Sequence, residues 1–210
     1  MPGEARAQKN PTVYIVDDDE NMCAVVAHLA ESVGLDTRSF VSASAFLDYF
    51  RREAPGCVLT DVRMPGMSGL ELLETLARRG LTIPVILMTS YADVPLAVRA
   101  LRAGAWDLVE KPFNHQELID RLQGAVRRDV AAWREQRRVR QAEERFATLS
   151  PREREVLDRV ARGLANKQIA DELGISPKTV EVHRARLMSK MGAHSMAELI
   201  RMAVLAGSGA

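Results

Sequence analysis

Short runs of strand-like composition alternate with amphipathic stretches through the first half of the chain. The strand-like runs lie at residues 12–16, 35–40, 56–60, 84–89 and 107–110. Between them, apolar residues recur at helical spacing over residues 20–33, 43–52, 69–79 and 94–103, and a fifth helix is expected to start near residue 114. This alternation predicts an α/β fold with a doubly wound, five-stranded parallel sheet that helices cover on both faces.

The pattern changes in the second half. Apolar residues keep an approximate heptad spacing as far as Trp133 and then become rare in the charged segment REQRRVRQAEER. We interpret residues 125–147 as a charged helical linker, which either pairs with its copy in a dimer or stands as a single exposed helix. From residue 148 to residue 210 only helical patterns follow, at residues 151–162, 166–173, 177–191 and 195–206, which predicts an all-α domain of four helices.

Two of these helices form a helix–short turn–helix pattern. Gly174 suits a left-handed end of the helix at 166–173, and Ser176 and Pro177 favour the start of the helix at 177–191. An ordinary helical hairpin with a solvated basic face accounts for this pattern equally well. The outward face of the second helix carries side chains of the types that contact phosphates and base edges: Lys178, Thr179, Glu181, Val182, His183, Arg184, Arg186 and Lys190.

Charge separates the two halves, although the whole chain has a net charge of only +1. Residues 1–124 hold 12 basic and 17 acidic side chains, whereas residues 125–210 hold 17 basic and 11 acidic ones. An acidic half joined to a basic half indicates a different partner for each, with nucleic acid a candidate for the second.

Composition argues against a membrane or secreted protein. No stretch approaches the roughly 20 apolar residues of a membrane span. Residues 1–10 lack the apolar core of a signal peptide and are expected to form a disordered leader. Cys23 and Cys57 have neither metal nor redox spacing, which fits a reducing compartment. We therefore expect a cytoplasmic protein with no membrane partner.

Polar side chains follow four of the predicted strands: Asp17, Asp18 and Asp19, then Asp61, then Thr89 and Ser90, then Lys111. The carboxyl ends of the strands in a doubly wound sheet meet at one edge, so we expect these side chains to converge. Clustered carboxylates favour a hard divalent cation such as Mg²⁺, which would neutralise a phosphoryl group arriving at a carboxylate nucleophile. A lysine and a hydroxyl would bind the remaining phosphoryl oxygens. Taken singly, each of these residues is more often a turn, cap or loop residue.

Residues 11–124 resemble the receiver domains of bacterial two-component response regulators. The segments that carry the resemblance are VYIVDDDE, VLTDVRMPGMSGLELL, VILMTSYADV and AGAWDLVEKPF. The resemblance implies a flavodoxin-like fold in which Asp61 accepts a phosphoryl group from a sensor histidine kinase and Thr89 and Lys111 bind that group. It implies Mg²⁺ as the cofactor, held by the side chains of Asp17, Asp18 and Asp61 and by the backbone carbonyl of Arg63. It also implies a cis bond between Lys111 and Pro112.

The same resemblance implies a conformational switch at Thr89, Ser90 and Leu108. Many receivers have an aromatic residue where this chain has Leu108. Trp106 lies two residues earlier and is expected on the opposite face of the strand. We therefore expect Leu108 to act by repacking rather than by the usual aromatic rotation.

Arg63 and Tyr91 occupy positions that tune loss of the phosphoryl group in receivers. Their bulk predicts slow self-hydrolysis of phosphorylated Asp61. Arg63 also bears on an alternative function, an aspartate-nucleophile phosphohydrolase that uses the same carboxylates. Such an enzyme needs an acidic residue two positions after the nucleophile, where this chain has Arg63, so we expect that the protein is not an enzyme.

Residues 148–205 resemble the LuxR-type helix-turn-helix through the segment LSPREREVLDRVARGLANKQIADELGISPKTVEVHRARLMSKMGAHSMAELIRMA. The resemblance implies that residues 177–191 form a recognition helix in the major groove and that residues 195–206 form a pairing surface. It implies base contacts by Glu181, Val182 and Ala185, of which Glu181 could accept a hydrogen bond from cytosine N4. The residues that it places near phosphates are Lys167, Lys178, Thr179, His183, Arg184 and Lys190.

Receiver, charged linker and output domain follow one another as in the FixJ-like response regulators. That resemblance implies a transcription regulator in which phosphorylation of Asp61 promotes formation of a homodimer and binding to double-stranded DNA. A sensor histidine kinase and RNA polymerase are the further expected partners. A third interpretation keeps the DNA binding but makes the receiver a constitutive dimerisation module. Leu108 keeps this interpretation open, whereas the complete set of Asp17, Asp18, Asp61, Thr89 and Lys111 argues against it.

Overall fold

The computed structural model describes residues 10–207 of the chain. The chain divides into two compact units, one that ends at Trp133 and one that begins at Arg134. The leader expected at residues 1–10 lies outside the described residues except for Asn10. Within residues 10–207, no helix combines the length and the apolar character that crossing a membrane requires.

The first unit is an α/β fold, which confirms the predicted fold class. Its described residues form five parallel strands: β1 Thr12–Val16, β2 Asp36–Phe40, β3 Gly56–Asp61, β4 Val85–Thr89 and β5 Asp107–Glu110. The strand order is β2-β1-β3-β4-β5, so the winding of the chain reverses between β1 and β3. Ligands of doubly wound sheets bind at the carboxyl ends of the strands beside such a reversal.

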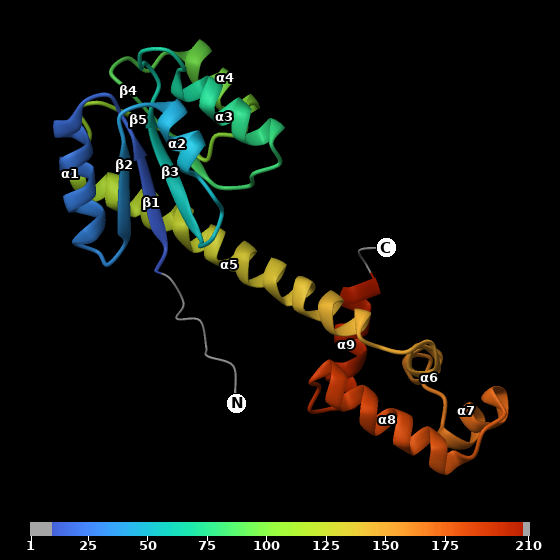
Figure 1. The fold of residues 1–210 in the computed structure, drawn as a ribbon. Coiled ribbons are helices and arrows are strands. Elements are labelled where there is room, and N and C mark those ends of the chain that lie inside the picture. Colours follow the sequence, from blue (N-terminus) through green and yellow to red (C-terminus); the bar gives the residue numbers. More distant parts are fainter. Residues whose placement is uncertain (1–9, 208–210) are drawn as a thin grey trace. The chain divides into compact units, whose positions relative to one another are not determined.

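Helices cover both faces of this sheet (Figure 1). They are α1 Glu20–Glu31, α2 Ala43–Tyr49, α3 Gly69–Arg78, α4 Val94–Arg102 and the first part of α5 His115–Ala147. α2, α3 and α4 pack on one face, and α1 and α5 pack on the other. Side chains alternate between the faces along each strand. In β1, Tyr14 and Val16 enter the first core, whereas Val13 and Ile15 enter the second.

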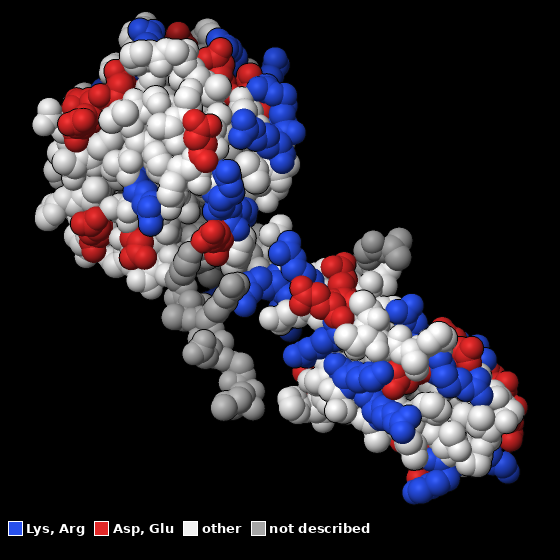
Figure 2. Space-filling view, in the orientation of Figure 1, with Lys and Arg blue, Asp and Glu red and all other residues white. Residues whose placement is uncertain are grey.

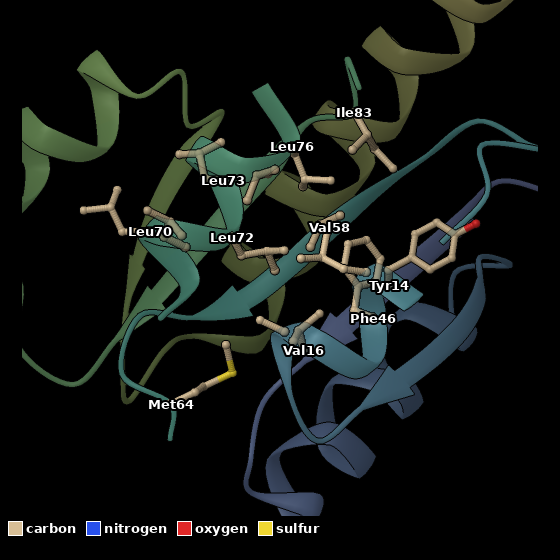
Figure 3. Packing of buried hydrophobic residues seen from close by; sticks show 14 of the residues in the cluster. Tyr14, Val16, Phe46, Val58, Met64, Leu70, Leu72, Leu73, Leu76 and Ile83 are labelled. Carbon is tan, nitrogen blue, oxygen red and sulfur yellow. The ribbon is translucent and has the colours of Figure 1, made fainter. Parts of the chain in front are cut away.

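Figure 3 shows the core beneath α2 and α3. Phe46 of α2 and Leu72 of α3 pack in one cluster with Val58 of β3, and all three are 0% exposed. The ring of Tyr14 meets Phe46 edge-on at 5.7 Å between centroids. Burial of a large apolar side chain stabilises a fold by roughly 1.5–3 kcal/mol. This core therefore holds β1 and β3 firmly in place, and these two strands lead into Asp17 and Asp61.

Several element ends differ from the predicted ones by one to three residues. α2 ends at Tyr49 rather than at residue 52, because Phe50 turns into an extended conformation with ψ 117 and buries its ring. α1 ends at Glu31 rather than at residue 33, where the chain turns through Gly34 with a φ of 78. β3 runs one residue further than predicted and includes Asp61, whose Cα pairs with that of Met88 in β4.

The second unit is helical throughout its described residues. After the end of α5 it contains α6 Pro151–Ala161, α7 Asn166–Leu173, α8 Pro177–Met191 and α9 Met196–Gly207. Val156, Ile169, Val180, Leu187 and Leu199 are each 0% exposed and form one core from all four helices. α6 starts with a capping box, and, as the sequence indicates, α7 ends at a left-handed glycine and α8 starts with a capped proline turn.

α5 is one helix that spans His115–Ala147 and contributes to both units. Leu118, Leu122 and Ala125 are fully buried against the sheet. Asp129, which continues their spacing, is 2% exposed although it carries a charge. Its carboxylate accepts hydrogen bonds from Arg52 Nη2 at 2.8 Å and from the backbone N–H of Gly56 at 2.9 Å. The limits predicted for the linker, residues 125–147, and for the flanking domains stay predictions.

Candidate functional site

The strand ends bring four predicted site residues to one edge of the first unit. Asp17 directly follows β1, Asp61 ends β3, Thr89 ends β4, and Lys111 directly follows β5. Parallel registers place these ends side by side: Val16 pairs with Thr60, and Thr89 pairs with Glu110. The convergence expected at the carboxyl edge of the sheet is therefore present.

Lys111 joins the two buried carboxylates. Its Nζ lies 2.8 Å from Asp17 Oδ2 and 2.6 Å from Asp61 Oδ1, and the two aspartates are 1% and 7% exposed. Partial burial by itself lowers the pKa of the Lys111 amine, but its hydrogen bonds to Asp17 and Asp61 outweigh burial and raise that pKa above the ordinary value. The amine is therefore a firmly charged ammonium at neutral pH. The peptide bond that follows it, to Pro112, is cis, as the resemblance implies.

Backbone N–H groups orient the remaining carboxylate oxygens. Asp61 Oδ2 accepts from the N–H of Arg63 at 2.6 Å, and Asp17 Oδ1 accepts from the N–H of Asp19 at 3.0 Å. In each carboxylate, one oxygen thus accepts a hydrogen bond from a backbone N–H and the other accepts one from Lys111. Asp18 and the side chain of Arg63 are exposed at the rim of the site.

These residues fit a Mg²⁺ ion. Within residues 10–207, no group of three or more His, Cys, Asp or Glu side chains is arranged as a metal site. Mg²⁺ needs fewer, since one or two carboxylates suffice when carbonyls and water complete its shell. The ammonium of Lys111 lies between Asp17 and Asp61, which shows that the two carboxylates already accept a shared cation.

Thr89 reaches the same edge, but its hydroxyl is turned toward the following loop. The side chain is buried, and its Oγ1 donates to the carbonyl of Tyr91 at 3.0 Å and accepts from the N–H of Tyr91 at 3.2 Å. Ser90 beside it is exposed. The structure therefore ties the predicted switch hydroxyl to the loop between β4 and α4.

Leu108 and Trp106 lie on opposite faces of the sheet, as the strand period predicts. Leu108 packs against the core under α4, and Trp106 packs against the core under α5. The guanidinium of Arg128 lies 5.0 Å from the centroid of the Trp106 ring. A hollow of about 370 Å³ opens beside Leu108, and Phe113 and Arg121 contribute to its lining.

Gly69 is a site residue that the sequence analysis did not single out. It is the first residue of α3, and a Cβ at this position would lie 2.2 Å from the backbone oxygen of Asp61. No side chain fits at that distance, so α3 can approach the end of β3 only with glycine here. The signal was present in the sequence, because Gly69 lies inside the segment that resembles receivers.

In the second unit, α8 presents much of the predicted contact face to solvent. Lys178, Thr179, Glu181, Val182 and Ala185 are exposed, and so is Lys167 on α7. Val182 is 42% exposed, which leaves an apolar side chain free to meet an apolar group of a ligand. Lys178 Nζ and Glu181 Oε2 lie 2.9 Å apart, one turn of the helix from each other. Figure 2 shows basic side chains gathered over the part of this unit where α8 runs, with acidic side chains among them.

Two residues of the outward face predicted for α8 are half-buried, and a third, Lys190, is exposed but pairs with α6. His183 and Arg184 are half-buried, and Arg184 Nη1 donates to Asn166 Oδ1 of α7 at 2.6 Å. Lys190 Nζ lies 2.7 Å from Glu153 Oε2 of α6. The Lys190 bond and the backbone N–H of Ser150 lower the pKa of Glu153 to about 2. The helix turns this flank toward α6 and α7 because these residues stand between its inward and outward positions.

Comparisons with known proteins agree with this two-part arrangement. Residues 13–123 match the response regulator receiver domain family, and residues 147–203 match the luxR family of bacterial regulatory proteins. The transcriptional regulatory protein FixJ of Azorhizobium caulinodans is 49% identical over 195 residues, which cover 93% of this chain and 92% of that protein. Nodulation protein W of Bradyrhizobium diazoefficiens is 42% identical over 205 residues, which cover 98% of this chain and 90% of that protein.

Two solved structures extend the similarity across most of the chain. The response regulator StyR is 40% identical with a TM-score of 0.84, over 92% of this chain and 98% of that one. Full-length FixJ from B. japonicum is 42% identical with a TM-score of 0.56, over 96% of this chain and 98% of that one.

Proposed function

The chain belongs to the FixJ-like two-component response regulators, transcription factors that join a receiver domain to a LuxR-type DNA-binding domain, and we propose that phosphorylation of Asp61 controls its binding to DNA. One observation carries the proposal. Lys111 holds its ammonium against both Asp17 and Asp61, so a nucleophilic carboxylate, an acidic neighbour and a phosphate-binding cation already share one site.

In the proposed reaction, a carboxylate oxygen of Asp61 attacks the phosphorus of a phosphohistidine on a sensor histidine kinase. The new P–O bond forms as the P–N bond breaks, and the imidazole leaves with its electron pair. Lys111 then exchanges a carboxylate partner for a phosphoryl oxygen, while the N–H of Arg63 keeps Asp61 oriented. The side chains of Asp17, Asp18 and Asp61 and the carbonyl of Arg63 would hold Mg²⁺, which supplies neutralisation of the phosphoryl charge.

We propose that Thr89 links this chemistry to a surface. Its hydroxyl has to leave the backbone of Tyr91 in order to reach a phosphoryl oxygen, so phosphorylation pulls on the loop before α4. That loop is also bound to β5, because the N–H of Ala92 donates to Glu110 Oε1 at 3.2 Å. Leu108, packed under α4, repacks as the loop moves. Slow self-hydrolysis, inferred from the bulk of Arg63 and Tyr91, would keep this state populated.

The surface that we propose to pair after phosphorylation is the exposed side of α4 and β5. Val94 and Leu101 on α4 are 76% and 69% exposed, which leaves apolar area that a second copy of the chain can cover. Two paired receivers, together with pairing through α9, would supply two recognition helices to one operator of inverted half-sites. RNA polymerase is the further partner that we propose for the DNA-bound dimer.

The test compares the affinity of the full chain for duplex DNA before and after treatment with acetyl phosphate and Mg²⁺. We expect tighter binding after treatment, with Asp61→Ala unresponsive and Asp48→Ala, at an exposed carboxylate of α2, responding like the wild type. A wild-type affinity that phosphodonor leaves unchanged would contradict the proposal. A protein that is fully dimeric and binds tightly without phosphodonor would instead support a constitutive dimerisation module.

A further inference from the structure

The last turn of α5 touches the end of the recognition helix. Arg145 Nη1 donates to the backbone carbonyl of Met191, the last residue of α8, at 2.8 Å. The final carbonyls of a helix have no partner within the helix, and its C-terminal end carries a partial negative charge. A guanidinium is well suited to both features, so this contact caps α8 from outside.

Gly192 makes room for that contact. It adopts a φ of 62, and its own N–H bonds back to Met188 and Ser189. A Cβ on Gly192 would lie 2.7 Å from Arg145 Nη1 and 3.0 Å from Arg145 Cζ. The left-handed turn favours glycine at position 192, and a Cβ there would in addition have to displace the guanidinium of Arg145.

The turn that carries Arg145 is itself fixed in the second unit. Ala142 is 1% exposed, and Phe146 packs against the core that α6 to α9 form. The carbonyl of Arg145 accepts from the N–H of Thr148 at 3.1 Å and from its hydroxyl at 2.6 Å. A second hydrogen bond joins α8 to the segment that follows α5, since Lys190 Nζ donates to the carbonyl of Thr148 at 3.2 Å. Two hydrogen bonds thus join the end of α5 to the end of α8, one with its donor near the end of α5 and one with its donor on α8.

We propose that Arg145 is a positioning residue for DNA recognition, which sets the place of the C-terminal end of α8. The other end of α8 is placed by the Ser176 cap, and its middle by the bond from Arg184 to Asn166. α5 begins at His115, four residues after Lys111, the proposed ligand of the phosphoryl group. It ends at Ala147, so Arg145 lies in its last turn. The hydrogen bond from Arg145 to Met191 lies within the second unit and joins the last turn of α5 to the recognition helix. This inference rests on the proposed function, in which α8 reads DNA.

The experiment measures the affinity of the full chain for two duplexes of equal length over a series of salt concentrations. One duplex is selected by the phosphorylated wild-type chain from a pool of randomised sequences, and the other is unrelated. The variants are Arg145→Ala, Arg145→Lys, and Arg140→Ala as a matched control at an exposed position of the same helix. Circular dichroism at the binding temperature confirms that each variant has kept its helices.

For Arg145→Ala we expect the ratio of selected to unrelated affinity to fall about tenfold, the size expected for loss of one charge-assisted hydrogen bond. The salt dependence should stay unchanged, because Arg145 positions α8 and does not neutralise a phosphate. Arg145→Lys, which keeps a charged donor, should recover part of the ratio, and Arg140→Ala should match the wild type.

Two results would overturn the inference and leave the proposed function intact. A uniform loss of affinity for both duplexes, with the salt slope reduced by about one, would make Arg145 a phosphate contact. If Arg145→Ala left the ratio of selected to unrelated affinity unchanged, Arg145 would have no role in sequence recognition. If Arg145→Ala loses its helices, Arg145→Lys decides in the same way by its ratio and slope. A wild-type chain that selects no sequence would instead overturn the proposed function, and this inference with it.

Discussion

The ammonium of Lys111 binds the same two carboxylates that a divalent metal ion would bind. Its ammonium lies 2.8 Å from Asp17 and 2.6 Å from Asp61, with its side chain 15% exposed. In such a partly desolvated site, an ammonium competes with any second cation for the same carboxylate oxygens. Under the proposed function, Lys111 would therefore have two opposite effects: it would weaken binding of a metal ion in the resting state, and it would bind the phosphoryl group once that group has arrived.

We expect Lys111→Ala to bind Mg²⁺ about tenfold more tightly than the wild type, because a competing charge has been removed. The same variant should accept the phosphoryl group more slowly, since it has lost a ligand for the phosphoryl oxygens. Isothermal titration with MgCl₂ measures the first effect. Lys167→Ala removes the same charge from an exposed position of the second unit and should leave Mg²⁺ affinity unchanged. Weaker binding of Mg²⁺ by Lys111→Ala would show that the lysine organises the site for the ion.

Glu153 combines a helix cap with an ion pair. Its side chain accepts from the N–H of Ser150 and binds Lys190 of α8, and these two contacts lower its pKa from 4.5 to about 2. A carboxyl whose pKa is lower in the folded state than in the unfolded one stabilises the fold above its unfolded pKa. That contribution is lost as the pH falls from about 4.5 toward 2.

Glu153→Gln keeps an acceptor for the N–H of Ser150 but loses the charge. At pH 7 we expect the free energy of unfolding of the second unit to fall by about 1 kcal/mol, as for a partly exposed ion pair. The difference from the wild type should shrink as the pH falls from about 4.5 and disappear below about pH 2. Thermal unfolding by circular dichroism at several pH values measures this, with Glu155→Gln, at an exposed position of α6, as control. A difference that does not depend on pH would assign the loss to packing.

At the scale of elements, α5 is attached to the sheet by a buried charge as well as by apolar packing. Asp129 on α5 binds Arg52 and the N–H of Gly56, the first residue of β3. Arg52 also lies 5.2 Å from the centroid of the Trp133 ring on α5. Gly56 cannot be replaced here, because a Cβ would lie 2.0 Å from the backbone oxygen of Thr12. These contacts join the start of β3, whose other end is Asp61, to the middle of α5.

Asp129→Ala should lower the free energy of unfolding of the first unit by about 3–5 kcal/mol, because it leaves a buried guanidinium and a buried N–H without their acceptor. Both tryptophans, Trp106 and Trp133, belong to this unit, so urea unfolding followed by tryptophan fluorescence reports on it. Asp120→Ala, at an exposed position of the same helix, serves as the control. A loss no larger than that of the control would show that the apolar contacts alone hold α5.

At the scale of the whole molecule, we expect two phosphorylated copies of the chain to pair through the exposed apolar side of α4. Leu101→Glu places a charge at a position that is 69% exposed, so it should not disturb the fold. We expect this variant to accept the phosphoryl group normally but to stay monomeric, with at least tenfold weaker binding to a duplex of two half-sites. Val41→Glu, at a position 54% exposed outside α4, should dimerise like the wild type.

Analytical ultracentrifugation with and without acetyl phosphate measures this difference in assembly. Dimers of phosphorylated Leu101→Glu would exclude the α4 side as the pairing surface. In that case pairing through α9 alone would have to account for assembly.

Much of this protein could be deduced from its sequence because the decisive signals are local. The alternation of strand-like and helical patterns determined the elements, and the chain order of strand and helix determined a parallel sheet. Parallel strands end at one edge, so Asp17, Asp61, Thr89 and Lys111 could be expected together before any coordinate was known. Ser176 and Gly174 predicted helix ends for the same reason, since a cap involves only the residues beside it.

Only the tertiary structure decided which side chains are partners. Lys111 meets residues 94 and 50 positions away, Arg52 meets one 77 positions away, and Arg145 meets one 46 positions away. Likewise, the turn of the Thr89 hydroxyl toward its own loop and the close approach of Gly69 to Asp61 leave no periodic trace in the sequence. Periodicity reports which face of an element is buried. The partner of a polar side chain depends on how distant elements pack against one another, and packing is a property of the folded chain.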